Sequence, residues 1–379
     1  MERSQATKFI IDLLQLLVSR RGSDLFITEN FPPALKVDGE LMKVSEQSLT
    51  GEHTAALARS LMNDYQIAEF ERSKECNFAI SPSGVGRFRV NAFMQRGSVG
   101  MVFRVIPNKI PTIEELQLPQ ILKSLVMNKR GLVILVGGTG SGKSTSLAAM
   151  LDWRNENTKG HIITVEDPIE FVHTHKNSIL TQREIGLDTD SWDSALMNAL
   201  RQAPDVVLMG EIRNRETMEL ALNFSETGHL CLATLHANNA NQTIERILKF
   251  FPDDAHAQLL SDLSFNLRGL VSQRLVPRQS GKGRVAAIEI LLNTPLMADL
   301  IANAQVSEMK ELMKRSRELG MQTFDHALYE LYDQNIISYD DALLNADSVN
   351  DLRLQIKLHS DRSRKEQPAS AALTLGIKT

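Results

Sequence analysis

The first hundred residues alternate apolar and polar positions in a pattern that predicts a small α/β domain. Residues 5–19 repeat apolar side chains at helical spacing, and a second helix is expected over about 52–70, where Thr50 begins a capping box that His53 completes only partly. Short apolar runs bounded by turn residues predict strands, the last three as an antiparallel meander, at 24–28, 34–38, 77–80, 87–93 and 100–105. We therefore expect residues 1–105 to form an N-terminal α/β domain.

A linker and a second domain follow. Residues 106–111 contain two prolines and predict a stiff, extended connection. Apolar runs with helical patterns between them then predict strands at 131–136, 161–166, 178–182, 205–209, 230–235 and 284–290. This alternation is typical of a mainly parallel sheet covered by helices. We expect such a core over residues 112–293, a mostly helical region over 294–358, and a polar, disordered tail over 359–379.

The composition narrows the class of protein. The chain has 379 residues, of which 42% are hydrophobic and 23% charged, as in a soluble globular protein of more than one domain. A net charge of −4 with two Trp and four Tyr argues against a nucleic-acid translocase, which needs basic grooves and stacking aromatic residues. Cys76 and Cys231 indicate no disulfide framework, which suits a reducing cytosol. No apolar run is long enough for a transmembrane segment, so any membrane association is expected through a partner.

The segment from residue 137 to 145 contains the most informative motif. It matches G-x-x-x-x-G-K-[ST] between an apolar strand and an expected helix over 145–153, a context that disfavours a flexible Gly/Ser linker. Backbone N–H groups and the helix N-terminus would bind the phosphates of ATP, Lys143 would reach the β- and γ-phosphates, and Ser144 would ligate Mg²⁺. The expected nucleotide-binding residues are Gly137, Gly138, Thr139, Gly140, Ser141, Gly142, Lys143, Ser144 and Thr145.

Acidic residues follow two later strands. Gly210 occupies the place after an apolar strand where an Asp usually stands, and Glu211 comes next. Glu211 is therefore a candidate general base or water-positioning residue, the alternative being a solvated side chain. Glu166 and Asp167 end another strand of the same predicted sheet, at the edge where ligands bind. We assign Glu166 to the Mg²⁺ shell, directly or through water, and Asp167 either to a secondary role or to capping the turn.

Two histidines and several arginines complete the set of candidates. His236 follows a third strand, at the place expected for a γ-phosphate sensor. His229 precedes that strand, and either a catalytic or a packing and capping role is open for it. Arg89 and Arg104 lie in the N-terminal domain. Surface arginines usually only solvate, yet an arginine supplied by a neighbouring subunit can accelerate phosphoryl transfer by roughly 10³–10⁵.

Together these residues resemble the PilT/PilU twitching-motility ATPases of the secretion-ATPase superfamily, over roughly residues 5–358. Four blocks carry the resemblance: Gly137–Thr145 as Walker A, Ile163–Val172 as the "Asp box", Leu208–Arg213 as an atypical Walker B, and Gly228–His236 as the "His box". The resemblance implies a PAS-like N-terminal domain, a RecA-like P-loop NTPase domain and a helical C-terminal region.

The resemblance also implies an assembly and partners. Members form homohexameric rings that hydrolyse ATP to disassemble type IV pili, and the spacing of Arg89 and Arg104 is similar to that of their paired arginine fingers. This implies a cytoplasmic protein, peripheral at the inner membrane, with a PilC-like platform protein as partner and no nucleic acid.

Departures from the family pattern refine the assignment. Only Cys231 lies in the C-terminal half, so the four-cysteine zinc element of the extension ATPases is missing, which favours the retraction branch. Glu311–Glu318 departs from the AIRNLIRE-like helix of PilT proteins, and the chain extends past Leu354, where PilT proteins typically end. Both favour the PilU branch, an accessory ATPase that acts with a PilT-like one. Phe26 stands where PilT-like sequences often have a His, so no role is assigned to that position. A nucleotide-binding ring acting mainly as an adaptor for another motor is the alternative.

Overall fold

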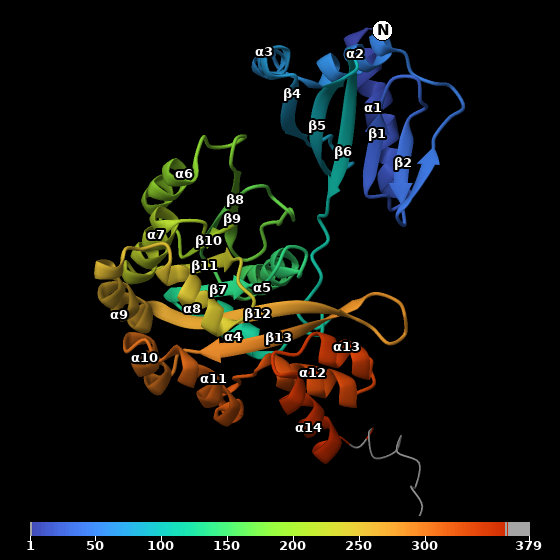
Figure 1. Ribbon diagram of the computed structural model, residues 1–379. Coiled ribbons are helices and arrows are strands. Elements are labelled where there is room, and N and C mark those ends of the chain that lie inside the picture. The colour runs from blue at the N-terminus through green and yellow to red at the C-terminus, as the bar shows by residue number, and fades with distance from the viewer. Residues whose placement is uncertain (1, 361, 363–379) are drawn as a thin grey trace, which may run out of the picture. The chain divides into compact units, whose positions relative to one another are not determined.

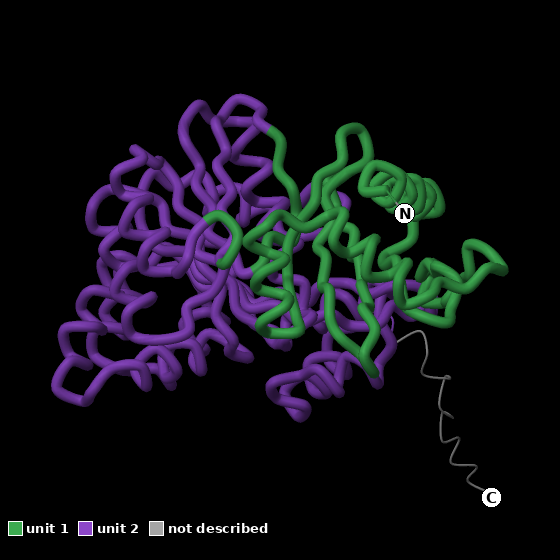
Figure 2. The backbone as a smooth tube through the Cα atoms, turned by 90° about the horizontal axis from the view of Figure 1, so that it is seen from above, with its two compact units in different colours: residues 1–110, 168–174, 186–188 green, residues 111–167, 175–185, 189–379 purple. Residues whose placement is uncertain are grey.

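The computed structural model describes residues 2–360 and 362 (Figure 1). The described chain divides into two compact units (Figure 2). The N-terminal unit comprises residues 2–110 with 168–174 and 186–188, and the C-terminal unit comprises the other described residues. The two short segments were expected in the 112–293 core, but their contacts place them with the N-terminal unit. Most of the tail expected to be disordered lies outside the described residues.

The N-terminal unit is an antiparallel sheet with helices packed on it. The strand order is β3-β2-β1-β6-β5-β4, with bounds β1 (Asp24–Ile27), β2 (Ala34–Val37), β3 (Glu40–Lys43), β4 (Glu75–Ile80), β5 (Arg87–Gln95) and β6 (Ser98–Ile106). The helices are α1 (Arg3–Ser19), α2 (Gly51–Leu61) and α3 (Asp64–Ser73). The apolar stripe of α1, including Ile10 and Leu14, is buried in one core with Phe88 and Phe103 of the sheet. The predicted meander is therefore confirmed as β4–β6.

The helix expected over 52–70 is wrong in one respect, because the chain forms α2 and α3 with a break between them. Asn63 accepts a hydrogen bond from Gln66 N and begins a new helix with a full capping box. The cap at Thr50 is also more complete than predicted, since His53 Nδ1 accepts from Thr50 N at 3.3 Å. The sequence signal for this break is the pair Asn63 and Gln66, whose spacing is that of a capping box.

The C-terminal unit is built on a sheet of order β13-β12-β7-β11-β10-β8-β9. The bounds are β7 (Gly131–Val136), β8 (His161–Glu166), β9 (Ile179–Glu184), β10 (Val206–Met209), β11 (Leu230–Leu235), β12 (Leu267–Pro277) and β13 (Arg284–Leu292). Neighbouring strands are parallel except at the edge, where β13 runs antiparallel to β12. The expected mainly parallel sheet is thus confirmed.

Helices cover both faces of this sheet, which explains the continuous apolar runs of its strands. Along β7, Leu132 and Ile134 join a core with the helices α6 to α11, whereas Val133 and Leu135 join a core with α4 and α5. The helices are α4 (Ile121–Val126), α5 (Lys143–Asn157), α6 (Trp192–Ala199), α7 (Arg215–Glu226), α8 (Ala240–Leu248), α9 (His256–Asn266), α10 (Pro295–Ala302) and α11 (Val306–Arg315).

The helical region after β13 packs at the end of the sheet. α12 (Phe324–Asp333), α13 (Tyr339–Leu344) and α14 (Val349–His359) share a core with Val276 and Val285 of the long β12–β13 hairpin. Within the described residues, no helix has the length and apolar character needed to cross a membrane.

Strand β12 was not predicted. Leu263, Leu267, Leu270 and Val271 continue the i, i+3, i+4 spacing of helix α9 into the strand, and the register shifts between Leu267 and Gly269. The bulge removes the two-residue period that would have identified a strand, so the spacing resembled a longer helix.

Candidate functional site

The predicted phosphate loop and the polar residues at the ends of three other strands lie along one edge of the C-terminal sheet. β7, β11, β10 and β8 are parallel neighbours with paired ends, because Val136 pairs with Leu235 and Met209 pairs with both Ala233 and Val165. The loop after β7, His236 after β11, Glu211 after β10 and Glu166 at the end of β8 therefore share this edge. This is the edge at which open α/β sheets bind ligands.

The loop from Gly137 to Gly142 requires glycine at two positions. Gly137 and Gly142 have φ values of +156° and +88°. A Cβ at Gly137 would lie 2.5 Å from Ser141 Oγ, and a Cβ at Gly142 would lie 2.6 Å from Gln273 Nε2. Ser141 Oγ is itself buried with no hydrogen-bond partner among the described residues. The loop is thus tightly folded around its backbone groups, and the Ser141 hydroxyl remains able to hydrogen-bond a ligand, which fits the binding of phosphates.

Lys143 begins helix α5 and folds back over the loop. Its Nζ donates to Gly137 O at 2.7 Å and to Gly138 O at 3.0 Å. Burial lowers the pKa of Lys143, and the carboxylate of Glu211 opposes that decrease. The ammonium group therefore stays close to the loop backbone and within the field of the acid that follows β10.

Glu211 lies in a polar cluster with a histidine and an arginine. Its Oε1 is 3.3 Å from His236 Nε2, and its Oε2 accepts a hydrogen bond from Arg213 Nε at 2.7 Å. Arg213 Nη1 is also 3.3 Å from Asp167 Oδ2, so the guanidinium joins the ends of β10 and β8. Glu211 and His236 are thus brought together as the sequence suggested, whereas the bridging role of Arg213 was missed. The sequence signal for this role was the position of Arg213 two residues after Glu211, close enough for the two side chains to pair.

Close packing explains why Gly210 replaces the usual acid. A Cβ at Gly210 would lie 3.0 Å from the Trp192 ring and 3.3 Å from Glu166 Cα. Gly210 N also donates to Val165 O at 2.8 Å, which holds the two strand ends together. An Asp side chain here would require Trp192 or the end of β8 to shift by a few tenths of an ångström, and Glu211 is the acid that this strand end presents.

Glu166 is held by polar neighbours at the end of β8. Its Oε1 accepts from Thr164 Oγ1 at 2.7 Å and from Gln182 Nε2 at 3.2 Å. β10 and β11 lie between β8 and β7, so Glu166 is three strand spacings, about 14 Å, from the strand that leads to the P-loop. That spacing favours a contribution to Mg²⁺ through water over direct ligation beside Ser144, whose side chain is exposed on α5.

The two histidines flanking β11 have different surroundings. His229 precedes the strand, and its Nδ1 lies 3.2 Å from Phe224 O and 3.1 Å from Thr227 Oγ1. Its ring packs edge-on against Phe224. Since the P-loop follows the other end of the paired strand β7, His229 is separated from Glu211 by the length of β11. Of the two roles left open for His229, these contacts favour packing and capping.

The predicted arginine fingers are cross-strand neighbours in the N-terminal unit. Arg89 on β5 pairs with Arg104 on β6, and Arg104 pairs with Asp24 on β1. Arg104 Nε donates to Asp24 Oδ1 at 2.8 Å, while the Arg104 side chain stays 65% exposed. Arg89 Nη2 donates to Ile169 O at 3.3 Å. Arg89 Nη2 also lies 3.9 Å from Glu170 Oε1, so each arginine has an acidic neighbour that offsets the repulsion between like charges on one ladder.

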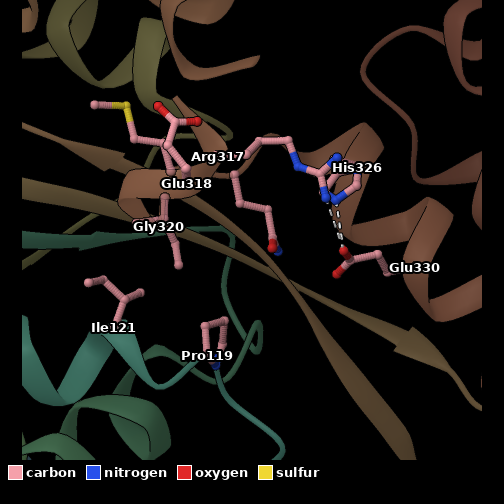
Figure 3. Close-up of a pocket in the computed structure, with 10 residues that line it drawn as sticks. Pro119, Ile121, Arg317, Glu318, Gly320, His326 and Glu330 are labelled. Atoms are coloured by element: carbon pink, nitrogen blue, oxygen red, sulfur yellow. Dashed lines mark hydrogen bonds and ion pairs between the residues drawn. The ribbon is translucent and has the colours of Figure 1, made fainter. Parts of the chain in front are cut away.

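A pocket of about 490 Å³ elsewhere in the C-terminal unit contains none of the predicted site residues (Figure 3). In it, Glu330 lies 2.8 Å from His326 Nε2 and 3.4 Å from Arg317 Nη2. Burial lowers the pKa of His326, although Glu330 opposes the decrease. Glu330 thus contacts both Arg317 and His326 in this pocket, which Glu318 also lines.

Comparison with protein families gives a match over most of the chain. Residues 2–335 match the family described as "Type II/IV secretion system protein". The chain is 61% identical over 349 residues to the Pseudomonas aeruginosa "Type IV pilus ATPase PilU", covering 92% of this chain and 91% of that protein. It is 43% identical over 333 residues to the "Type IV pilus retractation ATPase PilT" of the same organism, covering 88% and 96%.

Solved structures agree with the sequence relatives. The pilus retraction motor PilT with bound ADP matches with a TM-score of 0.85 at 39% identity, covering 91% of this chain and 99% of that one. The Legionella pneumophila ATPase DotB matches with a TM-score of 0.78 at 26% identity, covering 89% and 95%.

Proposed function

Since the chain belongs to the Type II/IV secretion system protein family and is an ATPase of the PilT/PilU type, we propose that it is a hexameric motor for type IV pilus retraction. The resemblance and the fold class expected from the sequence are confirmed by these matches. Identity of 61% to a PilU against 43% to a PilT supports the accessory role beside a PilT-like retraction ATPase.

The observation that carries the proposal is the shared sheet edge. The glycine-containing loop, Lys143, Glu211 and His236 come from consecutive parallel strands, and none of them depends on another domain for its placement. In this assignment the loop N–H groups bind the phosphates of ATP, and Lys143 moves from the loop carbonyls to the β- and γ-phosphates. Ser144 and, through water, Glu166 would hold Mg²⁺, which neutralises charge developing on the γ-phosphate.

Glu211 would orient the attacking water. Arg213 bonds one carboxylate oxygen of Glu211 and His236 approaches the other, so the side chain is held from both sides. A carboxylate held in one orientation by two neighbours can direct a water molecule toward the γ-phosphate, which favours a water-positioning role over proton abstraction. His236 would then act as the γ-phosphate sensor, because its contact with Glu211 couples its position to that of the attacking water.

The arginines of the N-terminal unit support a ring. Arg104 keeps an exposed guanidinium anchored by buried Asp24, a geometry suited to reach a phosphate of a neighbouring subunit. We place the ring in the cytoplasm at the inner membrane, where a PilC-like platform protein and a PilT-like ATPase would be its partners.

Hydrolysis by the purified chain tests the proposal. Glu211→Ala should bind ATP yet lose turnover, and Lys143→Ala should lose nucleotide binding, with Glu245→Gln on the exposed face of α8 as control. Normal turnover by Glu211→Ala would contradict the mechanism.

An adaptor ring is the second candidate, favoured by the departure of Glu311–Glu318 from the PilT motif. A strain carrying Lys143→Ala in place of the natural chain separates the two. Undiminished pilus retraction there, with loss on deletion of the chain, would identify an adaptor; lost retraction in both strains supports a motor.

A further inference from the structure

Gln273 lies on β12, the strand beside β7 that the sequence did not reveal. Its side chain is 3% exposed, and both ends of its amide are hydrogen-bonded. Nε2 donates to Ser141 O of the phosphate loop at 2.8 Å, and Oε1 accepts from Ser146 Oγ in helix α5 at 2.7 Å. One bond needs the amide NH₂ as donor and the other needs the amide oxygen as acceptor, so together they define the orientation of the amide. Gln273 thus joins the loop to the helix that follows it.

These bonds act on the part of the loop expected to bind phosphate. In a trans peptide the C=O of one residue and the N–H of the next point in opposite directions. The bond to Ser141 O therefore directs the Gly142 N–H away from Gln273, where it is available to a phosphate oxygen. Gln273 also occupies the space beside the loop, since a Cβ at Gly142 would lie 2.6 Å from its Nε2 and one at Gly137 would lie 2.6 Å from its backbone O.

We propose that Gln273 is a positioning residue for the nucleotide site: it holds the P-loop, from the adjacent strand, in the conformation that binds phosphate. The proposal rests on the proposed function of the loop. Without this clamp, the glycines of the P-loop would have broad conformational freedom before nucleotide binds. The entropy lost in ordering them would then reduce the affinity for nucleotide. Gln273 makes no contact with the reacting atoms in this assignment, so its loss should weaken binding more than turnover.

Nucleotide binding by the full-length chain tests this. Gln273→Met has similar length and shape but makes neither bond, and it should weaken binding of the fluorescent nucleotide mant-ADP by about tenfold, as for the loss of a buried hydrogen-bonded clamp. The KM for ATP should rise in parallel, while kcat at saturating ATP stays within about threefold. Gln273→Glu keeps the acceptor for Ser146 but places a carboxylate oxygen at Ser141 O, so it should bind mant-ADP more weakly still.

Ser272→Ala is the matched control. Ser272 is the preceding residue of β12, is equally buried, and bonds Glu289 on the other face of the sheet at 3.0 Å. It should bind mant-ADP as the natural chain does. Ser146→Ala removes only the orienting bond, and it should weaken binding by about two- to fivefold; combined with Gln273→Met it should add nothing, because the two residues act as one unit.

The outcomes separate this inference from the function on which it rests. Wild-type mant-ADP affinity in folded Gln273→Met, with binding lost in Lys143→Ala, overturns the role of Gln273 and leaves the nucleotide site intact. Wild-type affinity in Lys143→Ala as well overturns both. If Gln273→Met does not fold, unchanged affinity in Ser146→Ala overturns the clamp, and weakened affinity there supports it.

Discussion

Replacement of Glu289 by Gln should stabilise the C-terminal unit strongly at pH 8 and much less at pH 5. Glu289 lies on β13 with 2% of its surface exposed. Its Oε1 accepts hydrogen bonds from Ala240 N at 2.7 Å and from Ser272 Oγ at 3.0 Å. Burial raises the pKa of Glu289 to about 7, with Asp347 adding to the increase, while the two hydrogen bonds and Lys310 oppose it.

The direction of the pH dependence follows from this raised pKa. Between pH 4.5 and 7 the folded chain keeps the proton on Glu289 that the unfolded chain has released, so the free energy of unfolding falls as pH rises through this range. The difference between an ordinary pKa of 4.5 and about 7 corresponds to about 3 kcal/mol at pH 8. Because Gln retains the Oε1 acceptor without a charge, the variant should regain most of that amount at pH 8. At pH 5, close to the ordinary pKa of 4.5, it should regain less than about 1 kcal/mol.

Urea unfolding at both pH values measures the effect. The free energy of unfolding of Glu289→Gln minus that of the natural chain should be large and positive at pH 8 and less than about 1 kcal/mol at pH 5. Glu245→Gln, an exposed Glu-to-Gln change on α8, should show no such difference at either pH. An equal effect of Glu289→Gln at the two pH values, or destabilisation at pH 8, would refute the assignment of a buried carboxyl that prefers its proton.

Two further predictions concern charged side chains of the same unit. Arg213→Ala should lower kcat by about tenfold or more with the KM for ATP within about threefold, because Glu211 loses a charged hydrogen bond. Steady-state assays check this against Arg215→Ala, an equally exposed arginine paired with Glu219, and equal losses in both variants would count against a specific role. Asp347→Asn should destabilise by about 1–3 kcal/mol, since Arg274 loses a partly buried carboxylate partner and Lys310 keeps only Asp325, at 3.6 Å. Its urea midpoint at pH 7 reports the loss, and an unchanged midpoint would show the pairs to be dispensable.

The pH dependence of this second site has the opposite sign to that of Glu289. Although burial opposes it, Arg274 and Lys310 hold the pKa of Asp347 below its usual range. The stability contributed by Asp347 is therefore present above its ordinary pKa and lost as pH falls through the lowered one.

The sequence by itself determined the features that depend on neighbouring residues in the chain. The P-loop was readable because its glycines, lysine and flanking strand and helix are contiguous, and the need for glycine at Gly137 and Gly142 is partly a backbone requirement. The strands of the parallel sheet were readable because burial on both faces makes each an apolar run. The placement of Glu211 and His236 at one edge followed from strand direction alone, and the same reasoning, applied to His229 before its strand, would have placed that residue at the far end.

Tertiary structure decided what depends on partners distant in sequence. β12 carries a bulge that hides its period, and its position beside β7 comes from sheet assembly. The contact of Gln273 with Ser141, 132 residues away, has no local signal. The close contact that a side chain at Gly210 would make involves Trp192, which reaches this position only through helix packing. Local preferences could therefore identify a nucleotide-binding loop, but the side chains that shape it are selected by packing between strands.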